Sequence, residues 1–327
     1  MVTQEQIARR LGISRQLVTL ALAGYPQVSE ASRKRILAAA NKMGYRPNPH
    51  ARALRRGRIG IIALWVPDQI SSHYTHVARE LNRLVKAGQH ELIVSEIGNG
   101  EHHQWLSHVP VDGVVAVDAA AAVRAHLASG VTKSVPIISI GADCCTETDC
   151  VQVDLSAGTR EVMAHLLGTG RRRIVHATFI QGDEPEASRR VEYARAMTAA
   201  GLKPEYLHYP LSEEQRSIVR QMMPEYIREH GCPEAFFGHS DDIAMGIYRG
   251  LCDLNLRVPR QVALVGCDGI QDTEYLECPL TTLVQPVTEM CDLAWKFLGQ
   301  RLRRPAMARQ QAVLKPVLAV RASSSKA

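Results

Sequence analysis

From residue 58 onward, short apolar segments alternate with longer amphipathic ones. Seven apolar segments have the length of single β-strands: 59–66, 92–95, 113–117, 137–140, 174–178, 235–238 and 263–266. The stretches between them place apolar residues at helical spacing, as in 74–87, 157–167, 188–200 and 241–254. When strands alternate with helices, each helix returns the chain to the edge where the next strand begins. The pattern therefore predicts an α/β body with mostly parallel sheets.

The first 58 residues differ from the rest in charge. They contain twelve lysines and arginines but two acidic residues, whereas the remainder holds 27 basic and 31 acidic residues. Seven of the twelve basic residues lie between Arg33 and Arg55. A basic segment on a mildly acidic body favours binding of a polyanion by that segment alone. A basic face that is merely solvated is the alternative.

The overall composition is that of a globular chain, with 46% hydrophobic and 22% charged residues. No run of about 18 apolar residues, the length of a membrane span, is present. The first ten residues lack the apolar core of a secretory signal. We therefore expect a cytoplasmic protein without a membrane partner, with its eight cysteines reduced.

The basic segment has the pattern of a helix-turn-helix. Thr3 is suited to cap a first helix over 4–11, and Gly12 to form the tight turn that follows. Ser14 can cap a second helix. A third helix, from about Glu30 to Met43, would close the core. This spacing predicts a small three-helix unit in which two helices cross closely.

The outward face of the second helix is suited to reading DNA bases. Arginine can pair with two acceptors of guanine, glutamine with the edge of adenine, and threonine or leucine can touch a thymine methyl group. An ordinary three-helix bundle with surface residues at these positions is the alternative. The turn spacing and the local charge favour DNA binding. The outward residues are Arg15, Gln16, Thr19 and Leu20, opposite an apolar stripe of Leu17, Val18, Ala21 and Leu22.

Residues 2–54 resemble the lactose/galactose repressor (LacI/GalR) family, above all in Gly44-Tyr45-Arg46-Pro47-Asn48 followed by Ala51 and Leu54. The resemblance implies a hinge helix that enters the minor groove, where a leucine matching Leu54 wedges a base step open. The second helix lacks an arginine and an asparagine that are usual in the family, which leaves the operator sequence open. The implied DNA-binding residues are Thr3, Arg15, Gln16, Thr19, Leu20, Arg33, Asn48, Ala51, Leu54 and Arg55.

The resemblance continues through the body in a series of landmarks in the family's order, among them 111–113, 165–174, 239–246, 258–269 and 279–286. It implies a helix-turn-helix domain over 1–46 and a hinge over 47–58. An effector-binding and dimerisation domain over 59–327 follows, a periplasmic-binding-protein-like α/β fold of two Rossmann-like lobes. Lobe 1 is expected at about 59–153 and 285–313, and lobe 2 at about 154–284 and 314–323, with crossovers near Val153, Val284 and Leu314.

Ligands of open α/β sheets bind beyond the carboxyl ends of the strands, in the crevice between lobes. Polar residues follow two of the expected strands, and Arg189 stands where the family places an arginine on this crevice. Trp65 and Tyr74 flank the loop after the first body strand and could stack on a sugar or a planar base. The expected effector-binding residues are therefore Trp65, Tyr74, Arg189, Ser240, Asp241 and Asp268.

Each of these residues has a structural alternative. Asp241 could cap a helix and Asp268 could fix a loop, while Trp65 and Tyr74 could be core residues. Glu192 replaces a glycine of the family's motif around Arg189, and the neighbouring Arg190 is a competing candidate. No aromatic residue stands at Leu211-Ser212, where relatives often carry one, and the segment between Ser95 and Val111 is short for the family.

Two groups of potential metal ligands lack the spacing of known metal motifs. They are His102, His103 and His108, and Cys144, Cys145 and Cys150. We expect no metal and no cofactor, and oxidation of Cys144 and Cys145 is the remaining possibility for the thiols.

The sequence predicts a transcriptional repressor, not an enzyme, controlled by a sugar or a related metabolite. It is expected to bind an inverted-repeat operator in double-stranded DNA as a homodimer. Control by a protein partner, or no small-molecule effector at all, is the alternative. A fused enzyme such as a sugar kinase would need a glycine-rich phosphate loop, and the GTGRRR stretch at 168–173 is too short for one.

Overall fold

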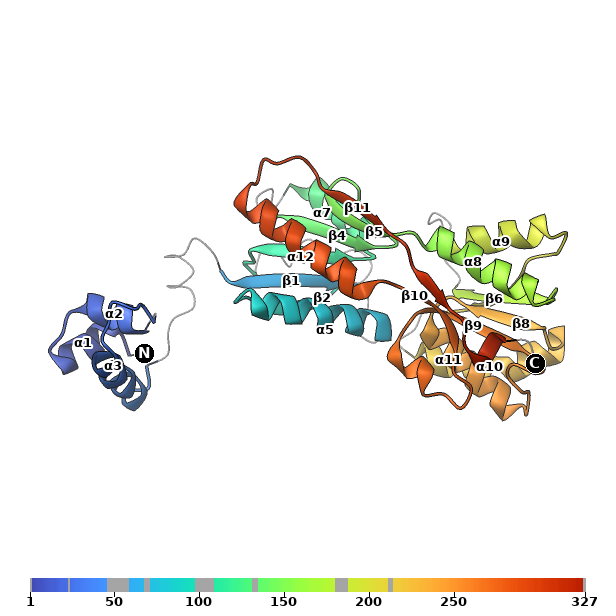
Figure 1. The fold of residues 1–327 in the computed structure, drawn as a ribbon, viewed down its shortest axis with the longest axis horizontal. Coiled ribbons are helices and arrows are strands. Elements are labelled where there is room, and N and C mark those ends of the chain that lie inside the picture. The colour runs from blue at the N-terminus through green and yellow to red at the C-terminus, as the bar shows by residue number, and fades with distance from the viewer. Residues whose placement is uncertain are drawn as a thin grey trace. The chain divides into compact units, whose positions relative to one another are not determined.

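The structure of the chain is a computed structural model. It describes residues 2–22, 24–45, 59–67, 71–97, 109–130, 135–179, 188–210 and 214–325. The chain divides into two compact units, Met1–Ile59, here called the head, and Gly60–Ala327, here called the body (Figure 1). The expected hinge over 47–58, with Asn48, Ala51, Leu54 and Arg55, lies outside the described residues.

The head is the predicted three-helix unit: α1 (Gln4–Leu11), α2 (Arg15–Leu22) and α3 (Glu30–Lys42). Thr3 caps α1 through a capping box with Gln6, and Gly12 ends the helix in the left-handed conformation with φ 65°. The Ser14 hydroxyl accepts a hydrogen bond from the backbone N–H of Leu17 (3.2 Å), which starts α2. The buried residues of the head core are Ile7, Ala8, Val18, Ala21, Val28, Ile36 and Ala40.

Within its described residues, the body contains two six-stranded sheets. Their strand orders are β11-β5-β4-β3-β1-β2 and β12-β10-β9-β8-β6-β7, and all neighbours are parallel except β10 and β12. The strands are β1 (Ile61–Val66), β2 (Glu91–Glu96), β3 (Gly113–Val117), β4 (Ile137–Gly141), β5 (Asp149–Val153), β6 (Ile174–Phe179), β7 (Glu205–Tyr209), β8 (Ala235–Gly238), β9 (Ala263–Asp268), β10 (Thr281–Val284), β11 (Gln311–Leu314) and β12 (Val317–Ala319).

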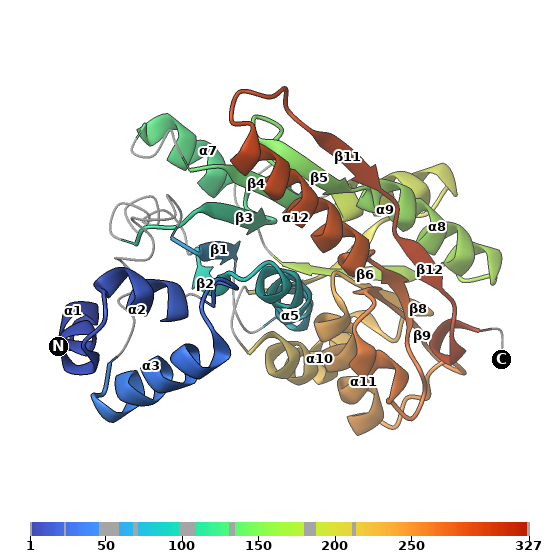
Figure 2. The same cartoon turned by 60° about the vertical axis from the view of Figure 1, so that its left-hand side comes forward.

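Helices cover both faces of each sheet. In the first, α5 (Ser72–Ala87) and α12 (Val287–Arg303) lie side by side on one face, and α7 (Ala120–Ser129) packs on the other (Figures 1 and 2). In the second, α8 (Leu155–Gly168) and α9 (Ser188–Ala199) form one layer, and α10 (Gln215–His230) and α11 (Asp241–Asp253) the other. Because both faces are covered, the central strands β3, β4, β8 and β9 are buried at every position rather than at alternate ones.

The chain passes from one sheet to the other three times, between β5 and α8, between β10 and α12, and between β11 and β12. We call the first sheet with its helices lobe 1 and the second lobe 2. The predicted fold class, a helix-turn-helix followed by a two-lobed α/β body, is confirmed. None of the described helices is long and apolar enough to cross a membrane.

Candidate functional site

The predicted DNA-reading face of α2 is divided in the structure. Arg15 and Gln16 are exposed, as expected for side chains that reach bases. Thr19 is half-buried, and its hydroxyl donates to Gln4 Oε1 (2.8 Å) or to the Arg15 carbonyl (3.0 Å). Leu20 packs against the head core, so the expectation that it points away from the core is wrong. Thr19 and Leu20 therefore help to hold α2 in place beside Arg15 and Gln16.

Two other predicted DNA contacts also have structural tasks. Thr3 is exposed, and its hydroxyl accepts from the Gln6 backbone N–H (3.3 Å) as the cap of α1. Arg33 is half-buried on α3 and donates from Nη2 to the Tyr25 carbonyl (2.5 Å), which fastens the segment after α2 to α3. One amino group of the Arg33 guanidinium is thus already hydrogen-bonded within the head.

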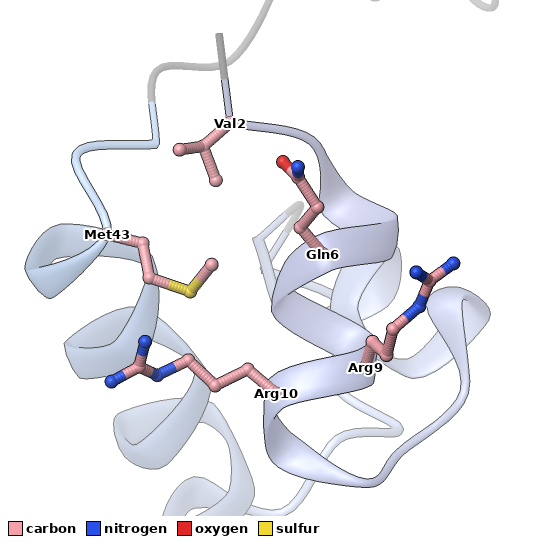
Figure 3. A pocket seen from close by; sticks show the side chains of 5 residues that line it. All are labelled: Val2, Gln6, Arg9, Arg10 and Met43. Atoms are coloured by element: carbon pink, nitrogen blue, oxygen red, sulfur yellow. The ribbon is translucent and has the colours of Figure 1, made fainter.

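A shallow hollow opens on another side of the head, between α1 and the end of α3. It is lined by Val2, Gln6, Arg9, Arg10 and Met43 (Figure 3). In this view, Arg10 reaches from α1 towards Met43 and α3, whereas Arg9 points away from them. No lining residue comes from α2, so the hollow is separate from the predicted reading residues.

In the body, Arg189 is the centre of a polar group at the strand ends of lobe 2. It lies in the first turn of α9, donates from Nη2 to His239 Nε2 (2.6 Å), and donates from Nη1 to Cys267 Sγ (3.4 Å). Burial, with help from this cation, keeps the pKa of His239 well below its ordinary value. Because Nε2 accepts, the neutral ring carries its proton on Nδ1. Nδ1 of His239 and Nε of Arg189 are buried without a hydrogen-bond partner among the described residues.

Asp268 ends β9 beside this group. It is 6% exposed, adopts a φ of +125°, and accepts a hydrogen bond from Gln285 Nε2 (2.9 Å). Burial raises the pKa of Asp268 to about 7, although Arg189 and the bond from Gln285 act against the rise. Gln285 Oε1 is buried and lacks a hydrogen-bond partner within the described part of the chain.

Asp241 fixes the loop that follows β9. Its Oδ2 accepts from the backbone N–H groups of Gly269 (2.7 Å) and Ile270 (2.9 Å), and its Oδ1 accepts from the Thr282 hydroxyl (2.6 Å). The side chain is completely buried, which raises its pKa to about 7. The alternative expectation of a helix cap is wrong for Asp241: the cap of α11 is Ser240, whose hydroxyl accepts from the Ile243 N–H (3.3 Å).

The two aromatic candidates pack in or against the core. Trp65 is 2% exposed within the apolar cluster under α7, with its ring edge-on to His126 at 5.5 Å between centroids. The stacking interpretation of Trp65 is therefore wrong and the packing one holds, as the unbroken apolar run over 61–66 could have indicated. Tyr74 is half-buried, packs against the main core, and contacts the His73 ring edge-on at 5.3 Å.

Sequence reasoning missed four residues of this polar group: His73, Asp118, His239 and Gln285. His73 is 4% exposed in the first turn of α5, and neither ring nitrogen has a hydrogen-bond partner among the residues described. Burial lowers the pKa of His73, while the charge of Asp118 in lobe 1 raises it and that of Arg189 in lobe 2 lowers it. Charged side chains of both lobes therefore influence the pKa of the His73 imidazole.

Asp118 directly follows β3, as Asp268 ends β9, and this shared position was a signal that the sequence offered. Its Oδ1 accepts from the backbone N–H groups of Ala142 (2.7 Å) and Asp143 (3.0 Å). The charge of Asp118 also raises the pKa of Asp268 and that of Arg189, which both lie in lobe 2. His73 and His239 offered no comparable signal, because their burial depends on distant elements.

The eight cysteines are all free thiols. A hydrogen bond to Cys150 and burial raise the pKa of Cys144, whose Sγ also lies 3.3 Å from the Gly141 carbonyl oxygen. Within the described ranges, no three histidine, cysteine or acidic side chains form a group that could hold a metal ion. His102, His103 and His108 lie outside those ranges.

Comparisons with known proteins agree with this division into head and body. Residues 3–48 match the family model of bacterial regulatory proteins of the lacI family, and residues 163–324 match that of a periplasmic binding protein-like domain. The ribose operon repressor of Escherichia coli K12 is 25% identical over 334 residues, which cover 99% of this chain and all of the relative.

Two solved structures share the fold. The lac repressor dimer bound to operator and the anti-inducer ONPF has a TM-score of 0.78 at 19% identity, over 99% of both chains. A LacI family regulator from Enterococcus faecium with bound ribose has a TM-score of 0.72 at 22% identity, over 82% of this chain and 99% of that one. The match to the head model, the landmarks of the body and the full-length similarity to the ribose operon repressor place this chain in the LacI/GalR family of bacterial DNA-binding transcriptional regulators.

Proposed function

We propose that this regulator is a homodimeric repressor controlled by a neutral, polyhydroxylated small molecule of the sugar class, bound between the strand ends of the two lobes. The supporting observation is a set of buried polar atoms without a hydrogen-bond partner among the described residues. They are Arg189 Nε, His239 Nδ1, Gln285 Oε1 and both ring nitrogens of His73. Left unsatisfied, such atoms cost about 1–3 kcal/mol each, so a ligand, or the water that it displaces, is expected to satisfy them.

The chemistry of these atoms favours hydroxyl groups. Arg189 and His239 offer N–H donors, whereas Gln285 and Asp268 offer oxygen acceptors. A hydroxyl group can accept from the first pair and donate to the second, which a carboxylate or an ammonium group cannot do. Trp65 is buried in the core and unable to stack on a planar base. Among the similar proteins, one is named for the ribose operon and one holds ribose, so pentoses are the first compounds to test.

The head supports binding in the major groove of duplex DNA through Arg15 and Gln16. One short α2 helix covers only a half-site, so we propose a dimer on an inverted repeat. By resemblance to the family, Leu54 is proposed to wedge a base step at the operator centre. On this proposal the chain binds its ligands and catalyses no reaction.

Thermal unfolding of the full chain in the presence of D-ribose, D-xylose, D-galactose and lactose tests the effector class. A ligand at 100 times its Kd stabilises the folded state by about 2.7 kcal/mol, which appears as a rise in Tm. The Arg189→Met variant should lose this rise. Arg190→Met is the matched control, because Arg190 lies over the Tyr206 ring (5.2 Å) and should leave the rise unchanged.

If none of these sugars raises Tm, the pentose and hexose class is wrong, and control by a protein partner becomes the better hypothesis. If both arginine variants behave alike, the site lies elsewhere. Operator binding has its own test, which is selection of DNA sites by the full chain. Recovery of inverted repeats, with affinity that falls steeply with salt, is expected. Recovery of unrelated single sites would contradict the dimer.

A further inference from the structure

The first turn of α5 in lobe 1 is capped by a residue of lobe 2. Ser71, at the N-cap position, makes no side-chain capping bond. Instead Asp242, the second residue of α11, accepts from the backbone N–H of Ser72 with Oδ2 (3.0 Å) and from the Ser72 hydroxyl with Oδ1 (3.0 Å). A carboxylate at this place satisfies an N–H that the helix itself leaves unpaired, and it complements the positive end of the helix dipole.

Arg216 on α10 completes the contact. Its Nε donates to Asp242 Oδ1 (2.8 Å), its Nη2 donates to the Ser72 hydroxyl (2.6 Å), and its guanidinium forms an ion pair with Asp242. The side chains of Ser72, Asp242 and Arg216 therefore each contact the other two. Ser72 precedes Arg216 by 144 residues and Asp242 by 170. Figures 1 and 2 both show α5 beside the pair α10 and α11.

The packing of α10 against α11 does not depend on the contact among Ser72, Asp242 and Arg216. Gly246 lets the two helices approach closely, because a Cβ there would lie 2.6 Å from the Arg216 carbonyl oxygen. At the C-terminal end of α11, Asp253 accepts from Arg220 of α10 (2.6 Å) and from Arg249 (2.6 Å), all within lobe 2. Unlike the Asp253 carboxylate, that of Asp242 also binds lobe 1.

Ser72 is followed directly by His73, whose buried ring is subject to the charges of Asp118, Arg189, Asp241 and Asp242. We infer that Asp242 is a positioning residue that holds the two lobes in the arrangement seen here, by capping α5 across the lobe boundary and thereby fixing His73 against lobe 2. The consequence for effector binding rests on the function proposed above, whereas the cap itself does not.

Contacts that exist in one lobe arrangement alone shift the population towards it. Removing the cap should lower the population of the arrangement seen here, and a ligand that needs this arrangement then binds more weakly by the same factor. By linkage, operator affinity of the ligand-free variant should move in the direction opposite to the shift that the effector causes.

The test is hydrogen–deuterium exchange of the full chain at single-residue resolution. In Asp242→Ala, the Ser72 amide should exchange at least tenfold faster than in the parent, with core amides of β3 and β8 unchanged. Asp253→Ala is the matched control and should leave Ser72 protected. Asp242→Asn keeps an acceptor for α5 but loses the charge for Arg216, and it should restore most of the protection. It also serves if the alanine variant fails to fold.

Unchanged Ser72 exchange in Asp242→Ala, or equal acceleration at Ser72 in Asp253→Ala, would overturn the cross-lobe cap. A second arm measures D-ribose affinity by calorimetry, where Asp242→Ala should bind at least tenfold more weakly and Asp253→Ala as the parent does. If the parent binds no ribose, the pentose proposal fails while the exchange result still decides the cap. If ribose binds both aspartate variants equally, the positioning role fails.

Discussion

The two lobes share one strand order, apart from a last strand that is parallel to its neighbour in lobe 1 and antiparallel in lobe 2, but they differ at the end of one corresponding strand. β4 and β9 occupy the same place in their sheets, and each ends in a residue with a strongly positive φ, +101° at Gly141 and +125° at Asp268. In both lobes the next two backbone N–H groups are bound by one carboxylate, that of Asp118 in lobe 1 and that of Asp241 in lobe 2. The loops are thus built alike.

Lobe 1 places glycine where the backbone requires glycine-like freedom, but lobe 2 places an aspartate there. A non-glycine residue in such a conformation costs about 1–3 kcal/mol, and it persists where the surrounding structure holds it and its side chain has a task. Asp268 is also buried, and burial raises the pKa of its carboxyl group. The comparison therefore indicates that lobe 2 accepts strain in order to present a carboxylate at the lobe boundary.

The helices that follow corresponding strands differ in the same direction. After the first strand of each sheet, lobe 1 starts α5 with Ser72 and His73, whereas lobe 2 starts α9 with Ser188 and Arg189. After β3, lobe 1 begins α7 with an alanine run, whereas after β8 lobe 2 begins α11 with Asp241 and Asp242 behind the cap Ser240. Lobe 2 thus holds most of the charged side chains at the lobe boundary, and we infer that it makes most of the ligand contacts.

The largest effect on the free energy of unfolding is expected when the aspartate of lobe 2 is placed at the corresponding strand end of lobe 1. Gly141→Asp copies lobe 2 into lobe 1, but a Cβ at Gly141 would overlap Asp118 Oδ1 and bring two carboxylates together. Asp118 would have to release the Ala142 and Asp143 N–H groups. We expect a loss of about 4 kcal/mol in the free energy of unfolding, measured by urea denaturation.

Gly170→Asp is the control for the backbone cost alone. Gly170 has a φ of +93°, and no atom of the described residues lies within 4 Å of its would-be Cβ, so a loss of about 1–2 kcal/mol is expected. Equal losses in the two variants would show that the Asp118 contact does not distinguish lobe 1.

Asp268→Asn tests the cost of the buried carboxyl group through its pH dependence. The folded-state pKa of Asp268, about 7, lies above its ordinary value of 3.8, so folding takes up a proton between these two pH values. Ionisation of Asp268 then makes wild-type stability fall as pH rises from 4 to 7, and an asparagine escapes this loss. We expect the variant to gain about 2 kcal/mol relative to wild type at pH 8, but little at pH 4.

Urea denaturation at both pH values measures that gap, and thermal shift with D-ribose should show that the same variant responds less to ligand. A gap that is equal at both pH values, or larger at pH 4, would contradict a raised pKa at Asp268. The combination of higher stability with weaker ligand response is the pattern expected when strain is kept for function.

Local features of the fold could be predicted closely from the sequence. The bounds of α1 depend on Thr3 and Gln6, which lie three residues apart, and on the turn at Gly12. The strands over 113–117 and 235–238 are apolar at every position except their glycines, and the structure gives them the same bounds. Five of the described strands were not among those expected, namely β5, β7, β10, β11 and β12. In β5 and β7, Asp149, Gln152, Glu205 and His208 interrupt the apolar pattern.

The candidate site was less predictable, because it depends on contacts between distant segments. Position after a strand pointed to Asp268, and the family resemblance pointed to Arg189. The tie from Asp241 to Gly269 joins residues 28 apart, and the cap from Asp242 to Ser72 joins residues 170 apart. Pairings of this kind leave no local trace in one sequence, so the roles of Asp241 and His73 needed the structure.

The smallest expected effect concerns the contribution of lobe 1 to ligand binding, tested by His73→Phe. Burial lowers the pKa of His73, so the ring is neutral and its loss removes hydrogen-bonding atoms rather than a charge. Phenylalanine retains an aromatic ring beside Tyr74 and leaves no buried nitrogen unpaired. A hydrogen bond of a neutral group is worth about 0.5–1.5 kcal/mol. D-ribose affinity should therefore fall about three- to tenfold by calorimetry, against about a hundredfold for Arg189→Met, while Tm stays equal or rises. An effect of His73→Phe as large as that of Arg189→Met would mean that the lobes share recognition equally, and unchanged affinity would mean that lobe 1 only closes over the ligand.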